Sequence, residues 1–112
     1  MTVKHIDIGR DFSEKLGPRY ENLGPFSGEL FYRTLLHPAY LENDLVVVSL
    51  DSFKNLSASF FEEAFGGLVR DHGLPEVEQK LKFDTARRGY LVPMIQVWMH
   101  EAEERRKKGK RK

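Results

Sequence analysis

The chain has 112 residues, no cysteine and 40% hydrophobic residues, eight of them phenylalanine, which suits one globular domain with a single core and excludes two. The absence of cysteine excludes disulfides and thiolate chemistry, and no apolar segment is long enough to span a membrane, so we expect a soluble, cytoplasmic protein. The net charge of +1 conceals a split, because residues 105–112 (RRKKGKRK) hold seven of the eighteen basic residues and no acidic one. We therefore predict an acidic domain over residues 1–104 and a basic, disordered tail over residues 105–112.

A first strand is predicted over residues 3–8, where apolar and polar side chains alternate, and we place it near an edge of the sheet. Residues 9–25 are expected to form a loop, because Gly-Pro pairs at positions 17–18 and 24–25 interrupt regular structure. Within this loop, a short strand over residues 19–21 is expected to pair back on the first strand.

A helix is predicted over residues 28–36, with its apolar side turned inward. Ser27 is its expected N-cap, because the Ser27 hydroxyl can accept a hydrogen bond from a first-turn N–H. The pair His37-Pro38 is expected to end the helix, since the residue before a proline is driven out of the α region.

The centre of the chain is the stretch 45–69, LVVVSLDSFKNLSASFFEEAFGGLV. Its opening apolar run is rich in β-branched residues and too short for a helix, which predicts a buried central strand over residues 45–50. Ser59 is then expected to start a helix over residues 59–72, because the sequence SFFE has the order of a capping box. Apolar residues at helical spacing give this helix one buried face, and Gly73 takes its C-terminal cap position.

The last third of the chain is predicted to contain one helical turn at residues 75–79, a strand over residues 80–83 and a helical segment over residues 85–107. Pro93 interrupts this segment, and either it kinks one long helix, at a cost of about 3 kcal/mol, or the helix restarts with Pro93 in its first turn. Strands that alternate with helices predict an α/β fold, with a mixed sheet of about four strands packed with helices and a long C-terminal helix.

Three segments carry a resemblance to a known family: Gly17-Pro18-Arg19, the run GPFSGE from residue 24 to 29, and the run SFFEEAFGGL from residue 59 to 68. Over roughly residues 5–83 the chain resembles the bacterial STAS-like domain of unknown function, which is related to the STAS fold of sulphate transporters and anti-sigma-factor antagonists. The resemblance implies a small STAS-like domain that acts as a non-enzymatic signalling or interaction module. It also implies docking to a histidine-kinase-like ATPase or another regulatory protein, because such relatives are often encoded beside, or fused to, ATPases of that kind.

Ser57 and Ser59 lie where the central strand leads into the central helix, a junction at which backbone N–H groups converge and favour negative charge. Two interpretations of Ser59 stay open: an ordinary N-cap, or a phospho-acceptor like the serine at this place in anti-sigma-factor antagonists. Ser57-Ala58 stand where those proteins have Asp-Ser, and Phe60 replaces a glycine, so we expect the cap.

A partner- or anion-binding surface is predicted around the glycine-bearing loop that leads into the first helix. Such a place can cradle phosphate, and an arginine can supply positive charge if the loop folds back. The alternative is a turn followed by a cap, since the loop lacks the lysine and the spacing of a P-loop. The predicted residues of this segment are Arg19, Gly24, Ser27, Gly28 and Glu29.

The central helix supplies the other half of this surface. Glu62 and Glu63 are expected to form a solvated or partner-facing edge, since neighbouring residues of a helix point about 100° apart and do not form a carboxylate pair. Gly66 and Gly67 each cost roughly 1 kcal/mol relative to alanine inside a helix. We therefore expect another backbone to approach these glycines closely.

No catalytic residue, metal site or cofactor is predicted, because the four histidines are scattered, cysteine is absent and no nucleophile is paired with a base. An alternative function is a small nucleic-acid-associated protein, in which residues 105–112 and Arg87-Arg88 contact phosphates. No aromatic residue is interleaved with the basic tail, so the interaction module is the favoured prediction.

Overall fold

Three parallel strands form the sheet in a computed structural model that describes residues 1–110; Arg111 and Lys112 lie outside the described residues. The strands are β1 (Val3–Asp7), β2 (Leu45–Ser49) and β3 (Leu81–Asp84). The helical elements are α1 (Ile8–Asp11), a 3-10 turn η1 (Glu21–Leu23), α2 (Gly28–Phe31), a π-helical segment η2 (Tyr32–Leu36), α3 (His37–Glu42), α4 (Ala58–His72), α5 (Leu74–Lys80) and α6 (Leu91–Lys110).

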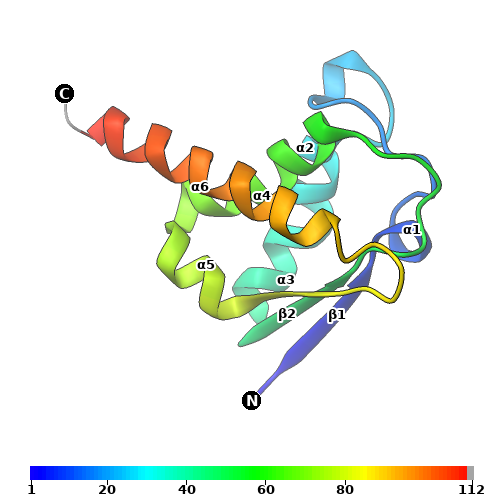
Figure 1. Cartoon of the computed structure of the whole chain (residues 1–112), viewed down its shortest axis with the longest axis horizontal. Helices are drawn as coiled ribbons and strands as arrows, with labels where there is room; N and C mark the ends of the chain where they lie inside the picture. Colours follow the sequence, from blue (N-terminus) through cyan, green and yellow to red (C-terminus); the bar gives the residue numbers. More distant parts are fainter. Residues whose placement is uncertain (111–112) are drawn as a thin grey trace.

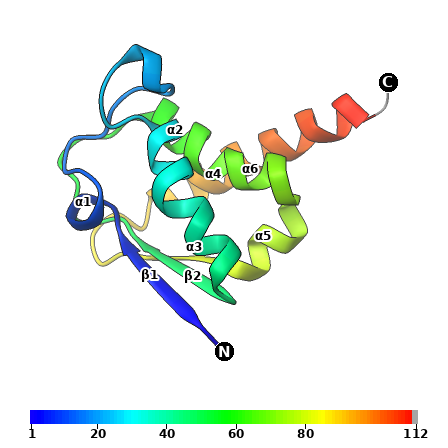
Figure 2. The same cartoon turned by 180° about the vertical axis from the view of Figure 1, so that it is seen from behind.

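β2 is the central strand, as its apolar run predicted, with β1 and β3 on either side of it. Val46 and Val48 are fully buried, whereas Val47 between them stands in a row with His5 and Lys82, which are both exposed. A layer of helices packs on the face of the sheet that carries Val46 and Val48 (Figure 1; Figure 2). The α/β fold class and the long C-terminal helix are thus confirmed.

The prediction of a mixed sheet of about four strands was wrong, because the described chain forms three strands that all run parallel. The expected strand over residues 19–21 does not form. The carbonyls of Pro18 and Arg19 instead accept hydrogen bonds from the N–H groups of Gly28 and Glu29, at 2.9 and 3.0 Å. Because this backbone satisfies the start of α2, it is not available to pair with the sheet.

The helix that Ser27 caps does not end at His37-Pro38, as predicted, but continues as far as Glu42. The π-helical segment η2 ends at Leu36, just before His37-Pro38, and the His37 N–H donates to the carbonyl of Tyr32 rather than to that of Arg33. A wider π turn changes the hydrogen-bond register just where Pro38 lacks an N–H. Sequence rules for proline did not anticipate this local accommodation.

α6 begins at Leu91, so Pro93 lies in its first turn and the restart alternative is correct. The helix runs without a break through Lys110, and residues 105–110 are therefore helical rather than disordered. Arg106 is one reason, because its guanidinium bonds the buried carboxylate of Glu103 at 3.3 Å and lies over Gly73. None of the helices in the described residues combines the length and the apolar character needed to cross a bilayer.

α4 is the helix that ties the other elements together. Phe60 and Phe61 are adjacent at its start and both buried, but they have different neighbours. The ring of Phe60 packs on Phe31 of α2 at 5.5 Å between centroids, and that of Phe61 stacks on Trp98 of α6 at 6.2 Å. These contacts fix α2 and α6 on opposite flanks of α4.

Asp51 links the loop after β2 to the turn that leads into α6. Its carboxylate accepts hydrogen bonds from the Thr85 hydroxyl at 2.7 Å and from the backbone N–H groups of Ala86 and Arg87 at 2.6 and 3.1 Å. These bonds favour the charged form, so the pKa of Asp51 falls from the usual 3.8 to about 2, chiefly through Thr85 and then Ala86. From its place just after β2, the carboxylate therefore orders residues 85–87, which follow the neighbouring strand β3.

Replacing Asp51 with asparagine is expected to lower the thermal midpoint at neutral pH. The midpoint of the variant should also fall less steeply than that of the wild type as the pH is lowered. The folded-state pKa of Asp51 is depressed, so its contribution is fully present above pH 3.8 and is lost as the pH falls through about 2. The difference in midpoint between the two proteins should therefore be constant from pH 7 to about 5 and shrink between about 4 and 2. Thermal melts across this range measure it; a difference that persists undiminished at pH 2 would contradict the assignment.

Candidate functional site

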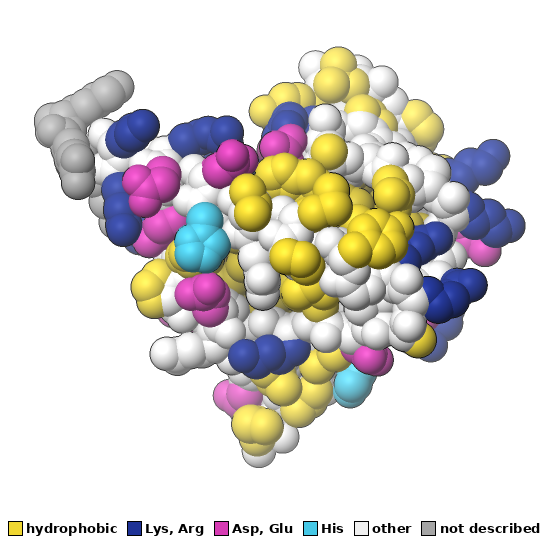
Figure 3. Space-filling model, viewed as in Figure 1, with side chains coloured by type: hydrophobic (Ala, Val, Ile, Leu, Met, Phe, Trp, Pro, Cys, Tyr) yellow, Lys and Arg dark blue, Asp and Glu magenta, His cyan; other side chains and the backbone are white. Residues whose placement is uncertain are grey.

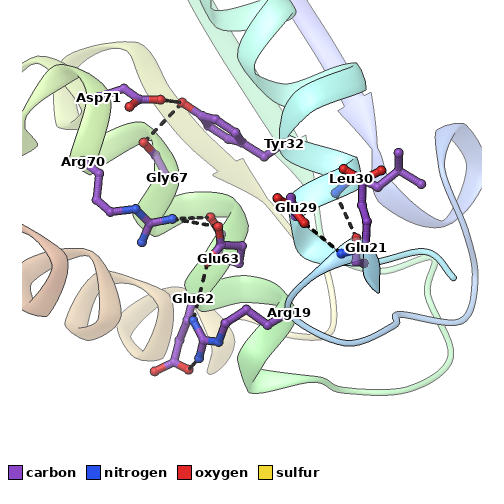
Figure 4. A network of polar contacts seen from close by, with 11 residues as sticks. Arg19, Glu21, Glu29, Leu30, Tyr32, Glu62, Glu63, Gly67, Arg70 and Asp71 are labelled. Carbon is purple, nitrogen blue, oxygen red and sulfur yellow. Dashed lines mark hydrogen bonds and ion pairs between the residues drawn. The ribbon is translucent and has the colours of Figure 1, made fainter. Parts of the chain in front are cut away.

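Loop 17–26, α2 and the exposed side of α4 come together at one end of the molecule (Figure 1). We call this region the loop–helix surface. The Ser57 hydroxyl donates to the carbonyl of Gly17 at 3.0 Å, which ties the loop to the start of α4. Arg19 of the same loop reaches the first turns of α4, as Figure 4 shows. The loop and the central helix, which were predicted to share one partner- or anion-binding surface, therefore lie side by side.

Ser57, and not Ser59, is the N-cap of α4. Its hydroxyl accepts from the Phe60 N–H at 3.3 Å, and the helix begins at Ala58, one residue earlier than predicted. The capping box is not formed, because the carboxylate of Glu62 binds Arg19 at 2.6 Å instead of reaching back to the start of the helix. Ser59 is the second residue of α4 and is half-buried, so it is free of the capping role that the sequence suggested.

The two serines are expected to respond differently to alanine. Ser57→Ala removes the cap and the bond to Gly17, and should cost about 1 kcal/mol of unfolding free energy. Ser59→Ala removes neither and should change it by less than about 0.5 kcal/mol. Urea denaturation of both variants measures the difference, and equal losses would mean that the two hydroxyls share the cap.

A chain of ion pairs runs along the exposed side of α4 (Figure 4). Arg19 lies 2.6 Å from Glu62 and 3.7 Å from Glu63, and Glu63 also accepts from Arg70 at 3.0 Å. These side chains are partly exposed, so each pair contributes little to stability on its own. Because Arg19 belongs to loop 17–26 and the two carboxylates belong to α4, the pairs together hold the loop against the helix and fix the positions of the carboxylates.

The start of α2 is closed to an anion, although it has the sequence of a phosphate cradle. The N–H groups of Gly28 and Glu29 donate to loop carbonyls, and that of Leu30 donates to the Ser27 hydroxyl at 3.0 Å. Gly24 closes the η1 turn through a 3.4 Å bond to Glu21. The first three amides of this helix are thus already bonded within the described chain, and Arg19 is paired with carboxylates. The turn-plus-cap alternative describes this segment.

The glycines of α4 meet side chains rather than another backbone. A Cβ on Gly67 would lie 3.1 Å from the ring of Tyr32, and one on Gly66 would lie 3.2 Å from Arg70 and 3.6 Å from Ala102 of α6. The close backbone approach occurs at Gly28, where a Cβ would lie 2.5 Å from the carbonyl oxygen of Phe60. The sequence pointed to close packing on α4 but not to Gly28 as the point of backbone contact.

A groove of about 360 Å³ lies between η2 and α4 beside these ion pairs. The Tyr32 hydroxyl donates to the carboxylate of Asp71 and lies 3.2 Å from the carbonyl of Gly67 (Figure 4). Burial, and then this hydrogen bond, raises the pKa of Tyr32 above its usual value. Sequence reasoning missed Tyr32 and Asp71, because they are far apart in the chain and neither belongs to a motif.

Four apolar side chains stay exposed on loop 17–26 and on the connection that leads into α4, and sequence reasoning missed them as well. Leu23 of η1 is 65% exposed, and Tyr20 and Phe26 of the same loop are 44% and 45% exposed. Leu56, directly before the cap, is 52% exposed, and its neighbour Asn55 binds the backbone of the adjoining loop at Leu16. We define the apolar rim as Tyr20, Leu23, Phe26 and Leu56.

The rim residues did not stand out in the sequence because single exposed apolar residues are common on protein surfaces. The two segments that carry them are joined only in the fold, through the bonds of Ser57 to Gly17 and of Asn55 to Leu16. Among residues 1–110, no three histidine, aspartate or glutamate side chains are grouped as a metal ion requires.

Comparison with known proteins gives one match. A family described as a STAS-like domain of unknown function (DUF4325) matches residues 27–87, which is more than half of the chain. This range includes α2, β2, α4 and β3, and therefore the framework of the sheet and one half of the loop–helix surface. No curated protein and no solved structure matches.

Proposed function

The chain belongs to the family of STAS-like domains of unknown function, and from this premise we propose that it is a non-enzymatic interaction module that docks a regulatory protein through the loop–helix surface. The apolar rim is the observation that carries the proposal. Its four exposed side chains lie on two segments that the bond of Ser57 to Gly17 joins at the start of α4, and exposed apolar side chains of this kind are typical of the centre of a protein interface. The ion pairs of Arg19 hold the loop in place, which reduces the ordering cost of binding.

The partner is expected to present an apolar pocket bordered by basic groups. Glu21, Glu29, Glu62 and Glu63 belong to the same loop and helices, where Arg19, Arg33 and Arg70 pair with three of them, and residues 1–104 carry eleven basic and seventeen acidic residues. Complementary charge of this kind accelerates association and selects the partner. A histidine-kinase-like ATPase, the class implied by the resemblance, is the partner that we propose to test.

Ser59 gives this surface a place for regulation. Ser57 is the cap, so a phosphate on Ser59 would leave the cap intact and would lie in the first turn of α4, where the helix dipole favours negative charge. We expect Ser59→Asp to fold as the wild type does and to weaken binding of the ATPase partner. Intact mass after incubation with ATP and that partner tests the modification directly. An unchanged mass would mean that this partner does not phosphorylate Ser59.

Leu23→Asp is the variant that tests the docking surface. Leu23 is 65% exposed, so the substitution should leave the fold intact while it places a charge in the rim. Leu41→Asp is the matched control, because Leu41 is 61% exposed but lies on α3. We expect calorimetric titration against the histidine-kinase-like ATPase encoded nearest to this gene to show at least about tenfold weaker binding for Leu23→Asp only. Equal affinities for both variants and the wild type would refute the docking surface.

A nucleic-acid-associated function is the second candidate, favoured by the helical extension of the basic segment. Arg105, Lys107 and Lys108 are exposed on the last turns of α6, which extend from the body of the protein (Figure 2). If they contact phosphates, binding to duplex DNA should weaken steeply as salt is added. The double variant Lys107→Glu/Lys108→Glu should then abolish the gel shift, whereas Leu23→Asp should leave it unchanged.

A further inference from the structure

Two histidines from distant parts of the chain meet where the start of α3 lies against the last turn of α4. The Nε2 atoms of His37 and His72 are 2.9 Å apart, which is a hydrogen-bond distance, and both side chains are partly buried. The pair lies at the opposite end of α4 from the Ser57 cap and outside the apolar rim. An inference about it therefore does not depend on the proposed docking function.

The π turn of η2 holds His37 in this position. The His37 N–H donates to the carbonyl of Tyr32, five residues earlier, and the two rings stack with centroids 4.8 Å apart. In an α-helix, residues five apart point about 140° away from each other, so it is the wider turn that places these rings one above the other. The ring of Tyr40 packs on His72 with centroids 4.6 Å apart. Each imidazole is thus supported by a tyrosine.

A hydrogen bond between two Nε2 atoms needs one proton, which one imidazole donates and the other accepts. Glu76 selects His72 as the donor, because Oε2 of Glu76 lies 3.7 Å from Nδ1 of His72. A proton added at Nδ1 of His72 faces that carboxylate and leaves the bond between the rings intact. The free lone pair of His37 is then the one at Nε2 that accepts this bond. A second proton added there opposes two N–H groups and two positive charges, and it breaks the bond.

From this geometry we infer that the histidine pair is a proton-sensitive lock between α3 and α4, which accepts one proton and is opened by the second. Opening separates His37 from His72 and releases the Tyr32 ring that is stacked on His37. Tyr32 and His37 both line the groove of about 360 Å³ between η2 and α4. Tyr32 is bonded across this groove to Asp71 (Figure 4), so the lock controls the shape of the groove.

The groups around the pair leave this response to the two histidines. Tyr40 donates to Glu76 at 2.5 Å, and burial raises the pKa of both Tyr32 and Tyr40 above its usual value, so neither hydroxyl loses its proton. Lys80 lies 4.2 Å from the centre of the Tyr40 ring and adds a positive charge to the cluster. Carboxylates and arginines ordinarily keep their charge above pH 5. Those that line the groove are Glu29, Arg33, Glu63, Arg70 and Asp71.

Urea denaturation of the full chain between pH 7.5 and 5 tests the inference, with EDTA present so that no metal ion bridges the imidazoles. Below about pH 6.5 the unfolded chain binds a proton on both histidines, whereas the folded pair binds only one. Because the unfolded state binds more protons, acid favours it. The folding equilibrium constant of the wild type should therefore fall by at least about tenfold relative to that of His37→Gln across this range. Glutamine can accept the bond from His72 but takes up no proton, and an equal dependence on pH in both proteins would overturn the inference.

His100→Gln is the matched control. His100 lies 3.7 Å from Glu78 of α5, but its side chain is 61% exposed. Figure 3 shows a histidine side chain at the surface beside α6, the helix that carries His100. This variant should keep the pH dependence of the wild type. Loss of the dependence here would assign it to an exposed histidine and would also overturn the inference.

Proton NMR of the folded protein separates opening of the lock from a general loss of stability. His37 should take up its proton at a more acid pH in the wild type than in His72→Gln, where glutamine accepts the bond. The contacts between the rings of Tyr32 and His37 should be lost in that step in the wild type and should persist in the variant. If His37 is protonated at the same pH in both proteins, or if the ring contacts survive the step in the wild type, the pair is not a lock and the inference is wrong.

Discussion

Phe61→Ala is expected to destabilise the protein by about 3–5 kcal/mol, a large part of the stability of a domain this size. Phe61 is 1% exposed, and its ring contacts Phe53, Phe60, Phe65 and Trp98 at centroid distances of 5.6, 5.8, 6.3 and 6.2 Å. Alanine would leave a cavity between α4 and α6 that these rigid rings cannot fill. Urea denaturation followed by tryptophan fluorescence measures the loss, since Trp98 is stacked on the deleted ring.

The control for this change is Leu56→Ala, an apolar deletion at a side chain that is 52% exposed and belongs to the apolar rim. It should alter the unfolding free energy by less than about 0.5 kcal/mol. Comparing the two variants therefore separates the stability contributed by a buried side chain of α4 from that contributed by an exposed side chain beside it. A loss below about 1 kcal/mol for Phe61→Ala would show that the space between α4 and α6 collapses around the cavity.

Gly28→Ala is expected to destabilise the protein by about 1–3 kcal/mol, although alanine is the better helix former. A Cβ at this position would lie 2.5 Å from the carbonyl oxygen and 3.0 Å from the Cα of Phe60, and backbone atoms cannot rotate away as the end of a side chain can. α2 and α4 would have to separate, which strains the contact between Phe31 and Phe60 and the loop bonds at the start of α2. Thermal melts should show a midpoint several degrees lower for each kcal/mol lost.

Gly89→Ala is the matched control, because a Cβ there would meet no atom within 4 Å. It should leave the midpoint nearly unchanged or raise it slightly, since alanine restricts the unfolded chain more than glycine does. If both variants melt together with the wild type, α2 and α4 can separate without cost, and the close approach at Gly28 is not a determinant of the fold.

Local patterns in the sequence were sufficient for the elements with a strong period. The β-branched run at residues 45–48 predicted the central strand β2, and the apolar residues at helical spacing predicted α4 as far as its cap at Gly73. Pro93 was correctly assigned to the first turn of a helix as one of two alternatives. In these segments the burial of one face and the backbone geometry depend on the same few consecutive residues.

Choices between equivalent local partners could not be made from the sequence. Ser57 and Ser59 both lie at the start of an apolar helix, and in the fold Ser57 is the cap, while Glu62 pairs with Arg19, far from it in the chain, instead of completing a capping box. The backbone carbonyls of residues 18 and 19 could accept hydrogen bonds from a strand or from a helix start. They bond the start of α2 because the fold places that helix beside them. A hydrogen bond is satisfied by whichever partner the fold brings near, and its energy does not depend on separation along the chain.

The sequence by itself determined the fold class, the family and the segments that make up the loop–helix surface, because each depends on a short run of residues with its own pattern. Only the tertiary structure decided that Tyr20, Leu23, Phe26 and Leu56 stay exposed, that Tyr32 reaches Asp71 and that the backbone of α2 approaches that of α4 closely at Gly28. These features are made by residues that have no periodic relation to one another. Their positions follow from how α2, α4 and loop 17–26 pack around the buried phenylalanines, and packing of that kind is a property of the whole core rather than of any segment.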